Sequence, residues 1–165
     1  MTKTSTKTEP ELEALNQLVG TWNTEASHPA LPGVVVGGSV TVEWLEGERF
    51  LIHRARTEHP DFPDSISIIG FTDQDRIGHA SNPAPAAADK PQLDMHYYDS
   101  RGVFRVFTLS IDHESWRFWR NTPGFSQRYT GTFADGGDTI VGVTQLCQDD
   151  VHWKDDLRIT YRRRA

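Results

Sequence analysis

Leu18-Val19-Gly20-Thr21-Trp22 is the stretch at which the sequence changes from a helical pattern to a strand pattern. Before it, leucines recur at helical spacing between residues 12 and 18, while Thr8, with Pro10 in the first turn, predicts the start of the helix. Gly20 is a typical residue to end such a helix. After Trp22, apolar and polar residues alternate to the end of the chain, which is typical of strands. The sequence therefore predicts a short N-terminal helix followed by an all-β domain.

The strand signals are separated by short turns rich in Asp, Asn and Gly. After Trp22 we predict strands at residues 39–44, 50–54, 65–72, 92–98, 103–111, 115–120, 126–133, 139–147 and 151–162. Connections this short join antiparallel neighbours and leave no room for parallel crossovers. Closing a sheet of about ten strands on itself removes its edges and leaves an interior that a small ligand can enter. We expect an antiparallel up-and-down β-barrel.

Size and composition favour one domain over residues 10–165, preceded by a flexible tail over residues 1–9. Hydrophobic residues make up only 36% of the chain, but five Trp, eight Phe and four Tyr concentrate its apolar surface in large rings that suit a cavity wall. The Pro- and Ala-rich segment 81–91 is predicted to be a surface loop, with a mobile flap over the barrel opening as the alternative.

Charge and residue usage exclude several classes of function. A net charge of −6 and a pI near 5.6 argue against nucleic-acid binding, and the terminal run Arg162-Arg163-Arg164 is interpreted as a soluble chain end. The N-terminus lacks a secretory pattern, and no apolar run is long enough for a membrane span, so we expect a cytoplasmic protein without a membrane partner. The single Cys147 and the scattered histidines predict no disulfide and no metal site. A homodimer is left open.

Strand alternation places several polar side chains on apolar faces. Arg105 alternates with Phe107, Leu109 and Ile111, and Arg120 shares a face with aromatic rings. The same pattern puts Gln127 beside Tyr129, and Asp155 beside Trp153 and Leu157. One interpretation is a structural ion pair between Asp155 and Arg105 or Arg120, because buried charges need partners. The other is that the arginines face an anionic or carbonyl-bearing ligand.

Residues 94–98 leave the inner face of their strand undecided, because Asp94, His96 and Tyr98 alternate with Met95 and Tyr97. If the first set faces inward, His96 and Tyr98 supply a proton donor and an orienting hydroxyl for acid–base chemistry. The alternative is a structural histidine, and the same two interpretations apply to His53.

Five stretches of the chain carry a family likeness: Leu18-Val19-Gly20-Thr21-Trp22, residues 42–51, residues 96–103, Phe125-Ser126-Gln127-Arg128-Tyr129 and Trp153-Lys154-Asp155-Asp156-Leu157. In them the chain resembles an actinobacterial lipocalin-like family of unknown function. The resemblance implies a calycin barrel. The chain is more distantly similar to nitrobindin barrels, in which a histidine on the last strand holds a haem. Here residues 153–162 of the last strand contain no histidine and His152 stands just before them, so the resemblance disfavours haem and implies no cofactor.

We therefore expect a barrel that binds a small hydrophobic or amphipathic organic molecule. The candidate ligand-binding residues are Trp44, His53, Tyr98, Arg105, Trp116, Phe118, Arg120, Gln127 and Tyr129. The alternative is a cyclase or isomerase of secondary metabolism, with His96, Tyr98 or Asp155 as the acid–base group. Haem binding and a purely structural or interaction role are further alternatives.

Overall fold

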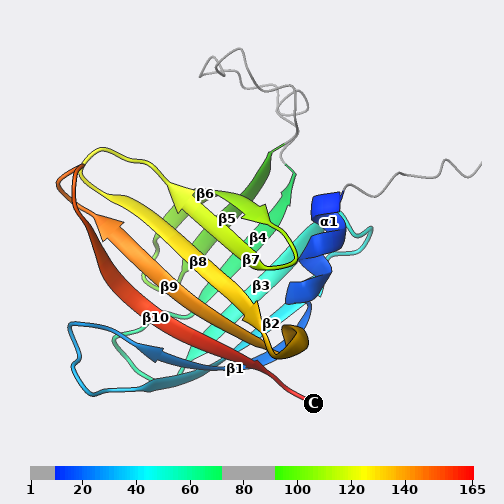
Figure 1. Cartoon of the computed structure of the whole chain (residues 1–165), viewed down its shortest axis with the longest axis horizontal. Helices are drawn as coiled ribbons and strands as arrows, with labels where there is room; N and C mark the ends of the chain where they lie inside the picture. Colours follow the sequence, from blue (N-terminus) through cyan, green and yellow to red (C-terminus); the bar gives the residue numbers. More distant parts are fainter. Residues whose placement is uncertain (1–9, 72–91) are drawn as a thin grey trace, which may run out of the picture.

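The protein forms a closed antiparallel barrel of ten strands in the computed structural model, which describes residues 10–71 and 92–165 (Figure 1). Each strand pairs with the next described strand along the chain, and β1 pairs with β10 to complete the ring. This arrangement confirms the predicted all-β up-and-down barrel with a short N-terminal helix. The predicted cap at Thr8, the tail 1–9 and the loop 81–91 lie outside the described residues.

Most strands match their predicted bounds within a few residues, but the strand at residues 20–27 was not predicted. The elements are α1 (Pro10–Ala14), η1 (Leu15–Leu18), β1 (Gly20–Ser27), β2 (Val36–Trp44), β3 (Phe50–Thr57), β4 (Ser65–Phe71), β5 (Leu93–Asp99), β6 (Phe104–Ile111), β7 (Ser115–Arg120), β8 (Ser126–Ala134), η2 (Asp135–Gly137), β9 (Thr139–Cys147) and β10 (Trp153–Arg163). Within these residues, no helix is long and apolar enough to cross a lipid bilayer.

The helical segment covers one end of the barrel, which we call the closed end (Figure 1). Leu12, Leu15 and Leu18 are buried in the core there, so the predicted apolar stripe lies on the barrel. Trp22 is 1% exposed, and its indole N–H donates to the carbonyl of Leu18 at 2.9 Å. Trp22 therefore plugs this end, and the opposite end is called the open end.

Arg163 locks the plug in place from the last strand. Its guanidinium lies 4.1 Å from the centre of the Trp22 ring and donates to the carbonyl oxygens of Val19 at 2.6 Å and Gln17 at 3.0 Å. A Cβ atom at Gly20 would lie 2.7 Å from Arg163 Nη1, so this approach requires glycine. Arg163 therefore has a structural role, and the interpretation of residues 162–164 as a solvent-exposed chain end is wrong for Arg163.

Replacing Arg163 with Ala is expected to lower the free energy of unfolding by about 2–4 kcal/mol, because the plug loses charge-assisted hydrogen bonds and ring stacking. Arg162→Ala is the matched control. Its side chain and that of Glu25 are each 58% exposed in their ion pair, so it should cost under about 0.5 kcal/mol. Urea unfolding followed by Trp fluorescence measures both. Equal losses in the two variants would contradict the role of Arg163.

Candidate ligand-binding site

Accessibility inside the barrel changes from one end to the other. Near the closed end the inward side chains are shut off from water, as at Leu51 and Ile69, both 0% exposed, and Ile140, 2% exposed. Toward the open end, inward residues of β1 and β2 such as Ala26 and Val36 stay buried, but inward residues of β3 to β5 and β7 to β9 are half-buried: Ala55, Ser65, Tyr97, Phe118, Arg120, Gln127 and Thr144. These side chains are therefore accessible from the open end of the barrel. We call this accessible interior the lumen.

Arginines and an amide line the lumen near its opening. Arg105 and Arg120 are half-buried, and the strand register places Arg120 directly opposite Gln127. Arg105 Nη1 donates to Gln127 Oε1 at 2.7 Å, and its guanidinium lies 5.0 Å from the centre of the Phe125 ring. We refer to Arg105 and Arg120 as the arginine pair. Burial, and next the positive charge of Arg120, lower the pKa of Arg105, which stays protonated.

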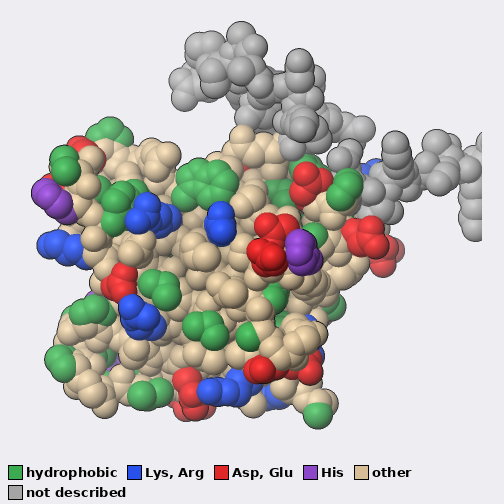
Figure 2. All heavy atoms as spheres, viewed as in Figure 1, with side chains coloured by type: hydrophobic (Ala, Val, Ile, Leu, Met, Phe, Trp, Pro, Cys, Tyr) green, Lys and Arg blue, Asp and Glu red, His purple; other side chains and the backbone are tan. Residues whose placement is uncertain are grey.

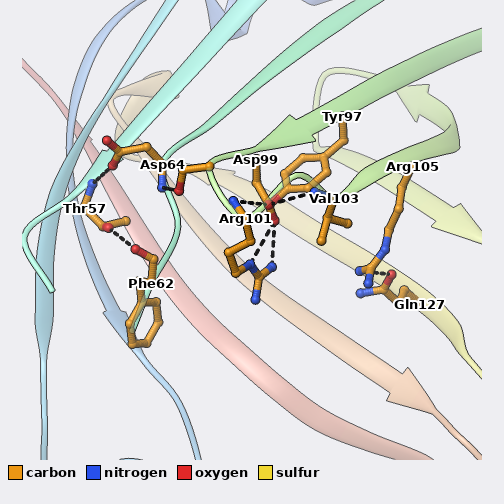
Figure 3. A network of polar contacts seen from close by, with 10 residues as sticks. Thr57, Phe62, Asp64, Tyr97, Asp99, Arg101, Val103, Arg105 and Gln127 are labelled. Carbon is orange, nitrogen blue, oxygen red and sulfur yellow. Dashed lines mark hydrogen bonds and ion pairs between the residues drawn. The ribbon is translucent and has the colours of Figure 1, made fainter. Parts of the chain in front are cut away.

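Asp99 ends β5, the strand that pairs with the Arg105 strand, and its carboxylate is already fully bonded (Figure 3). Its carboxylate accepts hydrogen bonds from the Tyr97 hydroxyl at 3.0 Å, from Arg101 Nη2 at 2.6 Å and from the backbone N–H of Arg101 and Val103. Burial alone raises the pKa of Asp99, but these bonds outweigh it and hold the pKa at about 2. Asp99 therefore neutralises Arg101. Burial, with the bond to Asp99, raises the pKa of Tyr97 to about 12.

Deeper in the barrel, three side chains carry polar atoms without partners. Both ring nitrogens of His53, the indole nitrogen of Trp116 and the hydroxyl of Tyr129 are buried and make no hydrogen bond within the described part of the chain. The rings lie together, with His53 6.4 Å and Tyr129 5.0 Å from Trp116 between ring centres. Unpaired buried polar groups cost about 1–3 kcal/mol each. We call His53, Trp116 and Tyr129 the floor cluster.

Two glycines leave the space that the ring of Tyr129 occupies. Gly131 and Gly142 face each other across β8 and β9. A Cβ atom at Gly131 would lie 2.6 Å from the Tyr129 hydroxyl oxygen. A Cβ atom at Gly142 would clash with the same phenol ring. The space of two absent side chains is thus filled by one aromatic ring, which stacks on Phe118 at 4.6 Å and 13°.

Most of the predicted ligand-binding residues come together inside the barrel. Seven point inward along the lumen and its floor: His53, Arg105, Trp116, Phe118, Arg120, Gln127 and Tyr129. Trp44 also belongs to the interior, but at the closed end, where its indole N–H donates to Asn16 Oδ1 at 2.8 Å. Sequence reasoning left out Tyr97, Asp99 and Ala55, of which Tyr97 was signalled by its alternation with Met95.

The three predicted acid–base residues lie elsewhere. Met95 and Tyr97 form the inner face of β5, so His96 and Tyr98 lie on the outer face. Tyr98 is 44% exposed and stacks on Phe104 at 5.0 Å. Asp155 is exposed because the register of β9 and β10 shifts between Asp155 and Arg158, a bulge that breaks the alternation used to place it.

The predicted structural ion pair between Asp155 and the arginine pair is also wrong. Asp155 accepts from Gln145 Nε2 at 2.8 Å and pairs with Arg158 on its own strand. These two hydrogen bonds, from Gln145 and then Arg158, lower the pKa of the Asp155 carboxyl. Neither Arg105 nor Arg120 has a carboxylate within 4.0 Å among the described residues.

The outer surface offers less defined features. Figure 2 shows acidic, basic and apolar side chains interspersed on one face of the barrel. A hollow of about 450 Å³ lies at the closed end between Gln17, Gly137 and Arg163, and another of about 310 Å³ lies beside Glu58 and Phe62. Neither contains a predicted ligand-binding residue. Among residues 10–71 and 92–165, no three His, Cys, Asp or Glu side chains gather as a metal site.

Together, the closed ring and the plugged end define a ten-stranded antiparallel barrel whose inward side chains are accessible at the opposite end. Family models and curated proteins give no match to the chain. Among solved structures, the chain is similar to the crystal structure of Rv2717c from M. tuberculosis, with a TM-score of 0.60 and 14% identity over 95% of this chain and 99% of that one. At this identity the likeness supports the fold alone. A protein of unknown function from the DUF3598 family of Nostoc punctiforme aligns with 11% identity over 94% of this chain and all of that one, but its TM-score of 0.27 carries no argument.

His53 is expected to make stability depend on pH. Burial lowers the pKa of His53 from 6.5 to about 4. On acidification, His53 is therefore protonated near pH 6.5 in the unfolded chain but only near pH 4 in the folded protein. Stability from this group is therefore lost as pH falls through that window, by roughly 2 kcal/mol between pH 7 and pH 5.

The measurement is urea unfolding at pH 7 and pH 5 for the parent protein and His53→Leu, with His113→Leu as the exposed control. The His53 variant should lose roughly 2 kcal/mol less on acidification than the other two proteins. An identical loss in all three would contradict the buried, neutral state of His53.

Proposed function

We propose that the protein binds a small, partly apolar organic molecule in the lumen. The observation that carries this proposal is the accessibility of inward side chains at the open end, next to a closed end that is packed solid. A space with one entrance and aromatic walls removes ligand surface from water, at a gain of about 25 cal/mol per Å² of apolar area.

The lining favours a flat or ring-containing body. The stacked rings of Phe118 and Tyr129 form one wall, whereas the small side chains of Ala55 and Ser65 leave room on β3 and β4. Aromatic walls bind flat apolar molecules by offset stacking. The calycin likeness of the sequence agrees with such a carrier, and we include that kinship in the proposal.

Binding is proposed in preference to catalysis because His96, Tyr98 and Asp155 lie outside the lumen. Haem fits the interior poorly, since the inward histidine, His53, has both ring nitrogens shut off from water by neighbouring side chains. His152 is exposed and bonded to Asp149, with 2.7 Å between Nδ1 and Oδ2. Haem ligation through His53 would require its ring to turn toward the lumen.

N-Phenyl-1-naphthylamine, a neutral fluorogenic probe, tests the proposal by titration. We expect saturable binding with one site per chain. Ala55→Trp fills the lumen with an indole and should weaken binding at least tenfold, about 1.4 kcal/mol. Arg56→Trp is the control, because residue 56 is exposed on the outer face of the same strand. Thermal unfolding establishes that both variants are folded. Unchanged binding in Ala55→Trp, or no binding to the parent protein, would refute the proposal.

A further inference from the structure

We propose that the ligand is an organic anion whose acid group is held by Arg105 and Arg120, with its apolar body directed toward the floor cluster. This inference rests on the proposed function and adds the chemical class of the ligand and its orientation.

The arginine pair forms a built site rather than a surface charge. Arg105, Arg120 and Gln127 come from three neighbouring strands, β6, β7 and β8, and all point into the lumen. The Gln127 amide oxygen anchors Arg105 at 2.7 Å and the Phe125 ring lies against its guanidinium. The Arg120 side chain makes no hydrogen bond or ion pair with any described residue. Its donors are therefore open to a ligand.

The charges around the pair are unbalanced. Asp99, the carboxylate at the end of the neighbouring strand β5, is bonded to Arg101, Tyr97 and two backbone N–H groups, as Figure 3 shows. This carboxylate is thus already used by other partners. The two half-buried guanidinium groups lie close enough that the charge of Arg120 lowers the pKa of Arg105. Such like charges repel each other in a partly desolvated site. An anion between them removes this repulsion and gains charge-assisted hydrogen bonds.

The position of the pair also sets the orientation of the ligand. From Arg120 to Trp116 the extended strand spans four residues, or about 13 Å. Over that distance the wall changes from arginine to the stacked rings of Phe118 and Tyr129. His53 is neutral at pH 7 because burial lowers its pKa to about 4, so it offers no charge to an acid at the floor. An acid group belongs at the opening, with one or two fused rings below it.

Two fluorogenic probes that differ by a sulfonate test the inference: 8-anilino-1-naphthalenesulfonate and N-phenyl-1-naphthylamine. The parent protein should bind the sulfonate at least tenfold more tightly than the neutral amine. Arg120→Gln should reduce the affinity for the sulfonate about tenfold and leave the affinity for the amine unchanged. Arg117→Gln is the matched control, since it removes the same charge from an exposed, outward position of the same strand and should change neither.

The folded state of Arg120→Gln is checked by its melting temperature, which should be equal to or above that of the parent, because no native bond is lost and repulsion is relieved. Arg105→Gln serves as the second variant. Competition distinguishes an organic anion from a free inorganic anion. 2-Naphthoate should displace the sulfonate probe, and inorganic phosphate at the same concentration should not.

Equal binding of the two probes, or equal weakening by Arg117→Gln and Arg120→Gln, would overturn the anion site while leaving the lumen intact. If inorganic phosphate displaces the probe as effectively as 2-naphthoate does, the inference that the ligand has an apolar body is wrong. If neither probe binds, the proposed function itself fails.

Discussion

The barrel depends on the closure of one end by Trp22, whose indole donates to Leu18 and whose ring lies beneath the Arg163 guanidinium. This contact joins the N-terminal helical segment to the first and last strands, whose pairing closes the ring. Because water is excluded there, the large apolar side chains pack solidly at that end. The interior is left accessible where β5 to β8 carry arginine, glutamine and tyrosine instead of aliphatic residues.

A gradient of polarity along the barrel axis follows from this closure. Aliphatic side chains fill the closed end, aromatic rings with unpaired polar atoms lie in the middle, and paired and unpaired arginines line the opening. The floor cluster and the arginine pair both reduce the stability of the empty protein. The floor cluster also contributes large apolar rings to the core, which offsets part of this cost.

The sequence predicts the fold well because period-two alternation and short turns are local signals. It locates most of the site for the same reason, since Arg105, Phe118 and Gln127 alternate correctly. The failures have physical causes. At β5 both faces carry rings, so His96 and Tyr98 cannot be distinguished from Met95 and Tyr97 by pattern alone. At β10 a bulge reverses the facing of Asp155. Arg163 was missed because its partners, Trp22 and Val19, lie more than 100 residues away in sequence.

If the lumen binds a ligand, the ligand lies in the accessible half of the interior, above a floor in the middle of the barrel. Intermolecular nuclear Overhauser effects between N-phenyl-1-naphthylamine and assigned methyl groups test it most directly. We expect contacts to the methyl groups of Ala55 and Thr144, which line the lumen, and none to Leu51 at the closed end. Contacts confined to Val106, which is 43% exposed on the outer face, would contradict it.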